Sequence, residues 1–292
     1  MNLHVRNLCK KLVPDRMLLL LRDYRAKFKL VTGVKRLNML QFEVHLADHC
    51  NLNCKSCNHF SPLAEEKYME ITDFENDCKR LGELTAGKVR FIRFMGGEPL
   101  LHNQITQFLE TGRAYFPKAE LIVVTNGIFL LEQHESFWKC CHDKNVYIQV
   151  SNYPVITDRD AIKTLAKKHK VTVDFVGGGK KMLWHAMKLD ENGQQNVSES
   201  FRLCAQSNAF IQLYKGKLFT CPTPAYIQYF NAYFDKNLQV TENDYVDIYK
   251  AKDIDEILDF LCNPIPFCKY CNVKSESNIA WDLSEKDINE WT

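Results

Sequence analysis

The chain has 292 residues, a formal net charge of +2 and a charged fraction of 25%. This length is enough for one large domain with a buried core, and a near-neutral charge gives no general attraction to nucleic acid. No apolar run approaches the roughly 20 residues that span a bilayer, and no signal-peptide pattern follows the basic start. We therefore expect a cytoplasmic protein.

The first forty residues are predicted to form a basic helical extension. Residues 1–36 hold ten lysines and arginines against two aspartates. The run RMLLLLRDYRAKFKL is typical of a helix whose leucines pack against the next domain. The alternative is attraction to an anionic partner, such as a membrane surface or a phosphorylated carrier.

The middle of the chain alternates between strand and helix patterns. Apolar or β-branched runs predict strands at residues 41–47, 89–95, 121–125, 146–150 and 171–176. Helical patterns lie between them at residues 71–84, 103–115, 132–143 and 161–169. Such alternation favours a parallel sheet. We expect an α/β fold in which residues 41–200 form an open, partial (β/α) TIM-like barrel of five to six parallel strands.

The loop after the first predicted strand is rich in thiols. It reads ADHCNLNCKSCNHFSPL and spaces Cys50, Cys54 and Cys57 as C-x3-C-x2-C. In a reducing compartment, clustered cysteines are more often metal or redox ligands than disulfides. Zinc usually takes four ligands, and no familiar zinc spacing is completed here. An iron–sulfur cluster held by three thiolates leaves one iron open to a cofactor.

Polar turns follow the next predicted strands. Gly96, Gly97, Glu98 and Pro99 come directly after the second strand. Two glycines let the backbone approach a ligand, and a carboxylate can pair with an ammonium group. Thr125-Asn126-Gly127 and Ser151-Asn152-Tyr153 follow the third and fourth strands. Loops after the strands of a (β/α) barrel share one mouth, so we expect these turns to converge.

A second thiol set lies after residue 200. A hairpin is predicted at residues 210–214 and 217–221, around Lys215-Gly216. The four cysteines in and around this region are Cys204, Cys221, Cys268 and Cys271. A zinc ion held by all four thiolates is one interpretation of this set.

With these motifs, residues 41–275 resemble the radical S-adenosylmethionine (SAM) superfamily. The resemblance implies that Cys50, Cys54 and Cys57 hold a 4Fe–4S cluster whose open iron binds SAM. It also implies that the Gly96–Pro99 turn recognises the SAM amino group, with Ser151, Asn152 and Asn126 nearby. The family usually has an aromatic residue near the adenine, before the third cysteine. Ser56 stands there in this chain, and we assign the role to Phe60.

Residues 201–292 resemble the shorter, twitch form of the SPASM auxiliary module. The motif that carries this resemblance is C-x11-G-x4-C followed by C-x2-C. It implies a second, fully ligated 4Fe–4S cluster on Cys204, Cys221, Cys268 and Cys271. Zinc remains the alternative at this set.

The likeness to the 2-deoxy-scyllo-inosamine dehydrogenase type implies a reaction. In this interpretation a 5′-deoxyadenosyl radical abstracts hydrogen from a carbinol carbon of a sugar or polyol, free or linked to a nucleotide or carrier. Dehydrogenation, dehydration and epimerisation all stay open. The reduced cluster needs an electron donor such as flavodoxin or ferredoxin. The alternatives are a radical SAM peptide or protein maturase and a non-enzymatic zinc-binding interaction module.

Candidate catalytic residues lie outside these motifs. Cys262 is a candidate hydrogen-atom donor, against the alternative of a buried apolar cysteine. Lys180 and His185 are candidate bases, together with Lys181 and Arg202, in the stretch expected to close over the mouth. The alternative for each of them is a solvated surface group.

Overall fold

The structure, a computed structural model, describes residues 37–155, 158–177 and 183–292. The predicted helix at the basic N-terminus therefore lies outside the described residues, apart from residues 37–40. No helix in the part that the structure describes is long and apolar enough to cross a membrane.

One sheet organises the molecule. Its strand order is β5-β4-β3-β2-β1-β7-β8-β9, and β1 to β5 pair in parallel. These five strands are β1 (Leu40–Ala47), β2 (Val89–Gly96), β3 (Glu120–Thr125), β4 (Val146–Ser151) and β5 (Thr172–Val176). The helices between them are α3 (Ile71–Thr85), α4 (Ile105–Tyr115), α5 (Glu135–Asp143) and α6 (Arg159–Lys168). This arrangement confirms the predicted α/β fold with a partial barrel.

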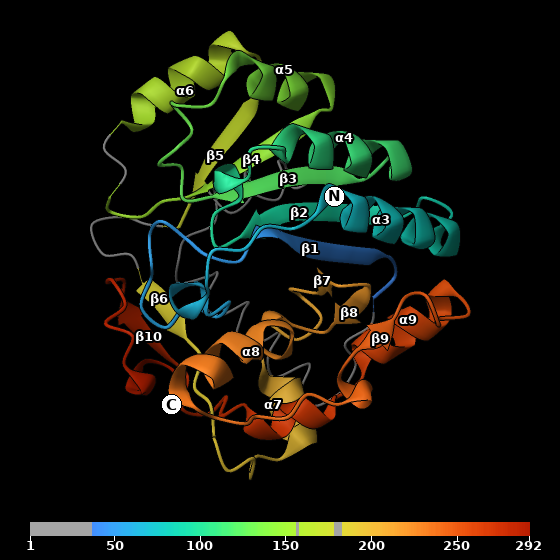
Figure 1. The fold of residues 1–292 in the computed structure, drawn as a ribbon, viewed down its shortest axis with the longest axis vertical. Helices are drawn as coiled ribbons and strands as arrows, with labels where there is room; N and C mark the ends of the chain where they lie inside the picture. The colour runs from blue at the N-terminus through green and yellow to red at the C-terminus, as the bar shows by residue number, and fades with distance from the viewer. Residues whose placement is uncertain (1–36, 156–157, 178–182) are drawn as a thin grey trace, which may run out of the picture.

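Strand β1 lies at the centre and is buried on both faces. Its residues at even positions, from Leu40 to Leu46, join the core that also contains side chains of α3 and α4. Its residues at odd positions meet the C-terminal part of the chain: Gln41 donates to the carbonyl of Ala209, and His45 stacks on Tyr226. In Figure 1, α3–α6 lie in the upper half of the molecule, and the C-terminal elements lie below β1.

The C-terminal part extends the same sheet. Strand β7 (Gln212–Tyr214) pairs in parallel with β1, and β8 (Lys217–Phe219) and β9 (Val246–Asp247) follow antiparallel. The predicted hairpin is confirmed, with shorter strands. Its turn residues Lys215 and Gly216 have φ of 50° and 70°, the left-handed pair that a tight two-residue hairpin requires.

The boundary predicted at residue 200 does not match the packing. Strand β6 (Leu183–Ala186) pairs antiparallel with β10 (Ser277–Ala280). Helix α7 (Val197–Leu203) packs against the 3₁₀ helix η4 (Pro266–Tyr270), and Ser200 donates to the carbonyl of Cys271. Residues 183–200 therefore pack with the C-terminal part, because their partners lie beyond residue 265.

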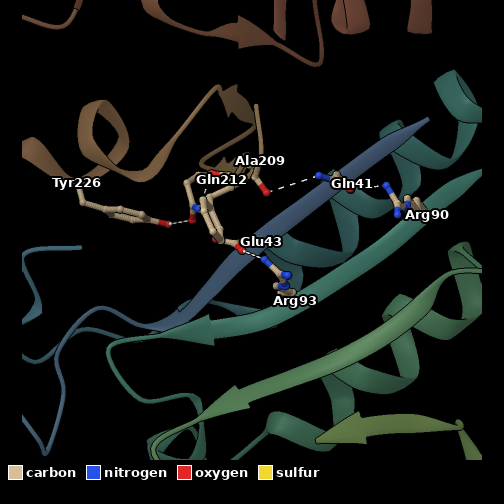
Figure 2. A network of polar contacts seen from close by, with 8 residues as sticks. Gln41, Glu43, Arg90, Arg93, Ala209, Gln212 and Tyr226 are labelled. Atoms are coloured by element: carbon tan, nitrogen blue, oxygen red, sulfur yellow. Dashed lines mark hydrogen bonds and ion pairs between the residues drawn. The ribbon is translucent and has the colours of Figure 1, made fainter. Parts of the chain in front are cut away.

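A buried polar network joins the two parts (Figure 2). The Glu43 carboxylate on β1 accepts from Arg93 on β2 at 2.6 Å and from Gln212 on β7 at 2.7 Å. Tyr226, on α8 (Pro222–Phe234), donates to the Gln212 side chain at 3.3 Å. A charge this deep needs such partners, so the network fixes β7 beside β1.

Candidate active site

A cavity of about 170 Å³ lies at the carboxyl ends of the parallel strands. Its walls come from the turns after β1, β2, β3 and β4, so the predicted convergence of these turns is observed. The predicted residues that line it are Cys50, Cys54, Cys57, Gly96, Gly97, Asn126 and Ser151. The cavity thus places three thiols beside a glycine turn and two polar side chains.

The three thiols are held where a bare thiolate would be costly. Burial raises the pKa of Cys50 and Cys54 to about 12, and it also raises the pKa of Cys57. N–H groups point at two of the sulfurs: Leu52 N lies 3.4 Å from Cys50 Sγ, and Trp281 Nε1 lies 3.1 Å from Cys54 Sγ. The thiols of such a site lose their protons when iron binds the sulfurs, and N–H donors stabilise the negative charge on the thiolates.

Three thiolates suit a multi-iron group with one open iron better than a zinc ion, which usually takes four ligands. In a cluster each thiolate binds its own iron, so the ligands need not crowd around one centre. The donor set therefore fits an iron–sulfur cluster, held by Cys50, Cys54 and Cys57.

Close backbone packing requires glycine at both positions of the turn after β2. A Cβ on Gly97 would lie 2.0 Å from the His49 carbonyl oxygen, and one on Gly96 would lie 2.2 Å from that of Ala47. Gly96 also has φ of 144°, which disfavours other residues. Gly97 N donates to Ala47 O at 2.8 Å. The turn after β2 thus packs directly on the start of the cysteine loop.

Glu98 holds two strand ends together. Its carboxylate is fully buried and accepts from Leu100 N, Thr125 Oγ1 and Asn126 N, at 3.1, 2.6 and 2.8 Å. Burial raises the pKa of Glu98 to about 7, and the three donors oppose that rise. Pro99 begins the short helix η2 (Pro99–Leu101) that Glu98 caps. The predicted contact of Glu98 with the SAM amino group stays a prediction.

The two predicted asparagines take different positions. Asn126 lines the cavity, and its Nδ2 donates to Asn51 in the cysteine loop at 2.7 Å. Asn152 instead donates from its backbone to Val176 and from its side chain to Gly177, at the end of β5. It therefore braces β4 against β5, and Ser151 beside it faces the cavity.

The assignment of Phe60 to the adenine is wrong. Its side chain is 1% exposed and packs against Phe230 and Trp291 in the C-terminal core, with ring centroids 5.8 and 6.1 Å away. The aromatic side chains that line the cavity are His59 and Tyr153. Tyr153 was within the predicted turn after the fourth strand, but no local pattern distinguished it from Asn152.

Cys262 is not placed to act at the cavity. It ends α9 (Ile254–Cys262), and its sulfur accepts from Leu37 N at 3.3 Å, close to the amino end of β1. The cavity lies at the other end of that strand, roughly 23 Å away at about 3.3 Å per residue. We therefore withdraw the hydrogen-donor role.

The candidate bases remain untested. Lys180 and Lys181 lie outside the described residues, and for His185 only its place in strand β6 is described. Arg202 lies in α7, beside η4, with its Nε buried and without a hydrogen-bond partner in the described structure.

The second thiol set also comes together. Cys204, Cys221, Cys268 and Cys271 are each 6–8% exposed. Burial raises the pKa of Cys271, and negative charge on the other three thiols would raise it further. The four side chains thus share one buried neighbourhood, although they are far apart in the sequence.

Comparisons with known proteins agree with this description. Residues 36–158 match the family model of a 4Fe-4S single cluster domain. GTP 3',8-cyclase of Helicobacter pylori (strain ATCC 700392 / 26695) is 32% identical over 30% of this chain and 27% of its own length. That of Mycobacterium ulcerans (strain Agy99) is 24% identical over 56% of this chain and 46% of its own length. The chain thus spans less than half of either relative.

One solved structure is similar over most of both chains. The crystal structure of BtrN in complex with AdoMet and 2-DOIA matches with a TM-score of 0.51 and 17% identity, over 81% of this chain and 94% of that one. At this identity the likeness concerns the fold. The matched 4Fe-4S single cluster domain, residues 36–158, contains both the cysteine loop and the glycine turn.

Proposed function

We propose that this chain cleaves SAM and uses the resulting 5′-deoxyadenosyl radical to abstract hydrogen from a hydroxyl-bearing carbon of a sugar or polyol. The observation that carries the proposal is the cavity that gathers Cys50, Cys54 and Cys57 beside the Gly96-Gly97 turn. When bound at the three thiols, a 4Fe–4S cluster supplies the electron that splits SAM.

The chain's own residues bind and orient the cofactor. Gly96 and Gly97 bring their backbone to the cavity wall, where it can meet the SAM amino group. Asn126 and Ser151 line the same cavity and offer hydrogen bonds from the carboxyl ends of β3 and β4. The cavity is small and largely apolar apart from these groups, which limits the water that could quench a radical.

The second thiol set is assigned to an auxiliary cluster with no open iron. Four buried cysteines that influence each other's pKa support this assignment. The substrate would lose one hydrogen atom to the deoxyadenosyl radical, giving 5′-deoxyadenosine. The substrate radical would then lose a proton to solvent and an electron to the auxiliary cluster, which leaves a ketone.

The likeness to BtrN supports a sugar-like substrate, since that protein was solved with AdoMet and 2-DOIA bound. The match to GTP 3',8-cyclases favours a second candidate, a radical reaction on a purine nucleotide. In both cases an external electron donor such as flavodoxin or ferredoxin would reduce the SAM cluster. Four buried cysteines would ligate a cubane fully and leave no open iron to bind a nucleotide, which favours the first candidate.

A deuterium-transfer assay separates the candidates. The reconstituted protein is incubated with SAM, reductant and, in separate reactions, GTP and a panel of aminocyclitols, polyols and nucleotide sugars, each deuterated at its carbinol carbons. We expect deuterium in 5′-deoxyadenosine from a member of the sugar panel. Transfer from deuterated GTP alone would overturn the sugar assignment and support the nucleotide reaction.

A further inference from the structure

A segment near the end of the sequence runs along the cluster loop. Residues 281–291, here called the C-terminal strap, follow β10 and lie beside the turn after β1 (Figure 1). Lys55 N donates to Asp282 O at 2.9 Å, and Ser284 N donates to Asn53 O at 2.8 Å. Between them, Cys54 and Leu283 form an antiparallel bridge. The strap thus pairs with the loop at the central cysteine.

Further bonds hold the strap at the third cysteine. Ser56 Oγ donates to Glu290 O at 2.7 Å, and Trp291 Nε1 donates to the Cys57 carbonyl at 3.0 Å. Glu290, which is 4% exposed, also accepts from Ser284 Oγ at 2.8 Å, so the strap is folded on itself. A strap fixed at both cysteines cannot shift without moving the loop.

Two aromatic donors converge on one sulfur. Trp281, in the strap, places Nε1 at 3.1 Å from Cys54 Sγ. Tyr153, after β4, belongs to the same buried cluster as Cys54, and hydrogen bonding by its side chain lowers the pKa of that thiol. The two rings lie 5.6 Å apart between centroids, and Tyr153 is 7% exposed. Cys54 therefore receives donors from two segments that are distant in sequence and packed against each other.

We propose that Trp281 and Tyr153 are positioning residues that set the reduction potential of the SAM-binding cluster through the Cys54 sulfur. The inference rests on the proposed function, because it assumes a cluster on the three thiols. A reduced cluster carries one more negative charge than an oxidised one. A donor to a ligand sulfur stabilises the reduced form more, and so raises the potential. A higher potential makes the cluster easier for the cellular donor to reduce.

Conservative variants isolate the two donors. Trp281→Phe keeps an aromatic ring and removes the indole N–H, and Tyr153→Phe removes only the hydroxyl. Trp291→Phe is the matched control, because it removes an indole N–H that donates to a backbone carbonyl and not to sulfur. Iron content and circular dichroism of each variant check that the site is assembled.

The readout is a reductive titration of the reconstituted full chain followed by electron paramagnetic resonance. The SAM-binding cluster is the one whose signal changes when SAM is added. At the potential that reduces half of the wild-type cluster, we expect clearly less than half to be reduced in Trp281→Phe and in Tyr153→Phe, and half in Trp291→Phe. If Trp281→Phe loses iron, Tyr153→Phe carries the test alone.

Two results would overturn the inference, and they differ. Unchanged potentials in both variants, with a SAM-responsive signal in the wild type, would refute the tuning role and leave the proposed function intact. The absence of any SAM-responsive signal in the wild type would refute the proposed function itself.

Discussion

Glu43 on β1 and Arg93 on β2 form an ion pair of 2.6 Å in which the Glu43 side chain is 2% exposed. Gln212 of β7 completes the site from the C-terminal part. The pair therefore lies where β1, β2 and the C-terminal strand β7 meet.

Removing one partner should be costly. Arg93→Met leaves a buried carboxylate without its cation, and we expect the free energy of unfolding to fall by roughly 3–5 kcal/mol. The control is Lys139→Met, which breaks the exposed pair with Asp143 and should change the free energy of unfolding little, because solvent screens such a pair. Urea denaturation measures both. Equal losses in the two variants would show that the buried pair has no special role.

Gly97 tests the contact between the two loops. A Gly97→Ala methyl group would collide with the His49 carbonyl, so the cysteine loop must move. We expect a large loss of bound iron and of SAM cleavage. Gly82→Ala in α3 is the matched control, since its nearest new contact is an ordinary 3.6 Å, and alanine favours a helix by about 1 kcal/mol. Iron retained at the wild-type level in Gly97→Ala would contradict this contact.

The buried carboxyl of Glu98 gives a pH dependence of stability. Its pKa is raised from an ordinary 4.5 to about 7, so between these values the folded state binds more protons than the unfolded state. Stability contributed by the protonated form is then present below pH 4.5 and lost as the pH rises to 7, by up to about 3 kcal/mol.

Urea denaturation across this pH range measures the effect. The wild type is compared with Glu98→Gln, and both are reconstituted in the same way. The fall between pH 4.5 and 7 should be smaller in the variant, which has no titrating group at this position. Identical pH profiles would place the titration elsewhere.

The auxiliary thiols predict a defined metal content. Replacing Cys204, Cys221, Cys268 and Cys271 together should lower iron from about eight to about four per chain, the content of one cubane. Iron and acid-labile sulfide analysis after anaerobic purification gives the answer. Zinc in place of iron in the wild type, with sulfide for one cubane only, would show that this set is a structural zinc site.

Local sequence patterns predicted the strands of the parallel sheet and the turns that follow them. The predicted boundaries of β1 to β5 differ from the observed ones by one residue at most, because buried runs and their flanking turns mark each strand. The convergence of the cysteine loop with Gly96, Asn126 and Ser151 followed from the rule that parallel strands share one carboxyl edge.

Long-range packing was beyond such patterns. Phe60 and Cys262 were misplaced, because neither a hydrophobic core nor the far end of a strand is visible in the residues around them. Trp281 reaches Cys54 across 227 residues of sequence, and no periodicity links the two. No local pattern predicts the pairing of β6 with β10 either, and this pairing joins residues 183–186 to the C-terminal part.

The most direct test of the account is the formation of 5′-deoxyadenosine by anaerobically reconstituted protein given SAM and reductant. The wild type should produce it. A variant with Cys50, Cys54 and Cys57 all changed to alanine should lose about four irons per chain and all 5′-deoxyadenosine. Undiminished SAM cleavage in that variant would contradict the central claim that these three thiols hold the SAM-cleaving cluster.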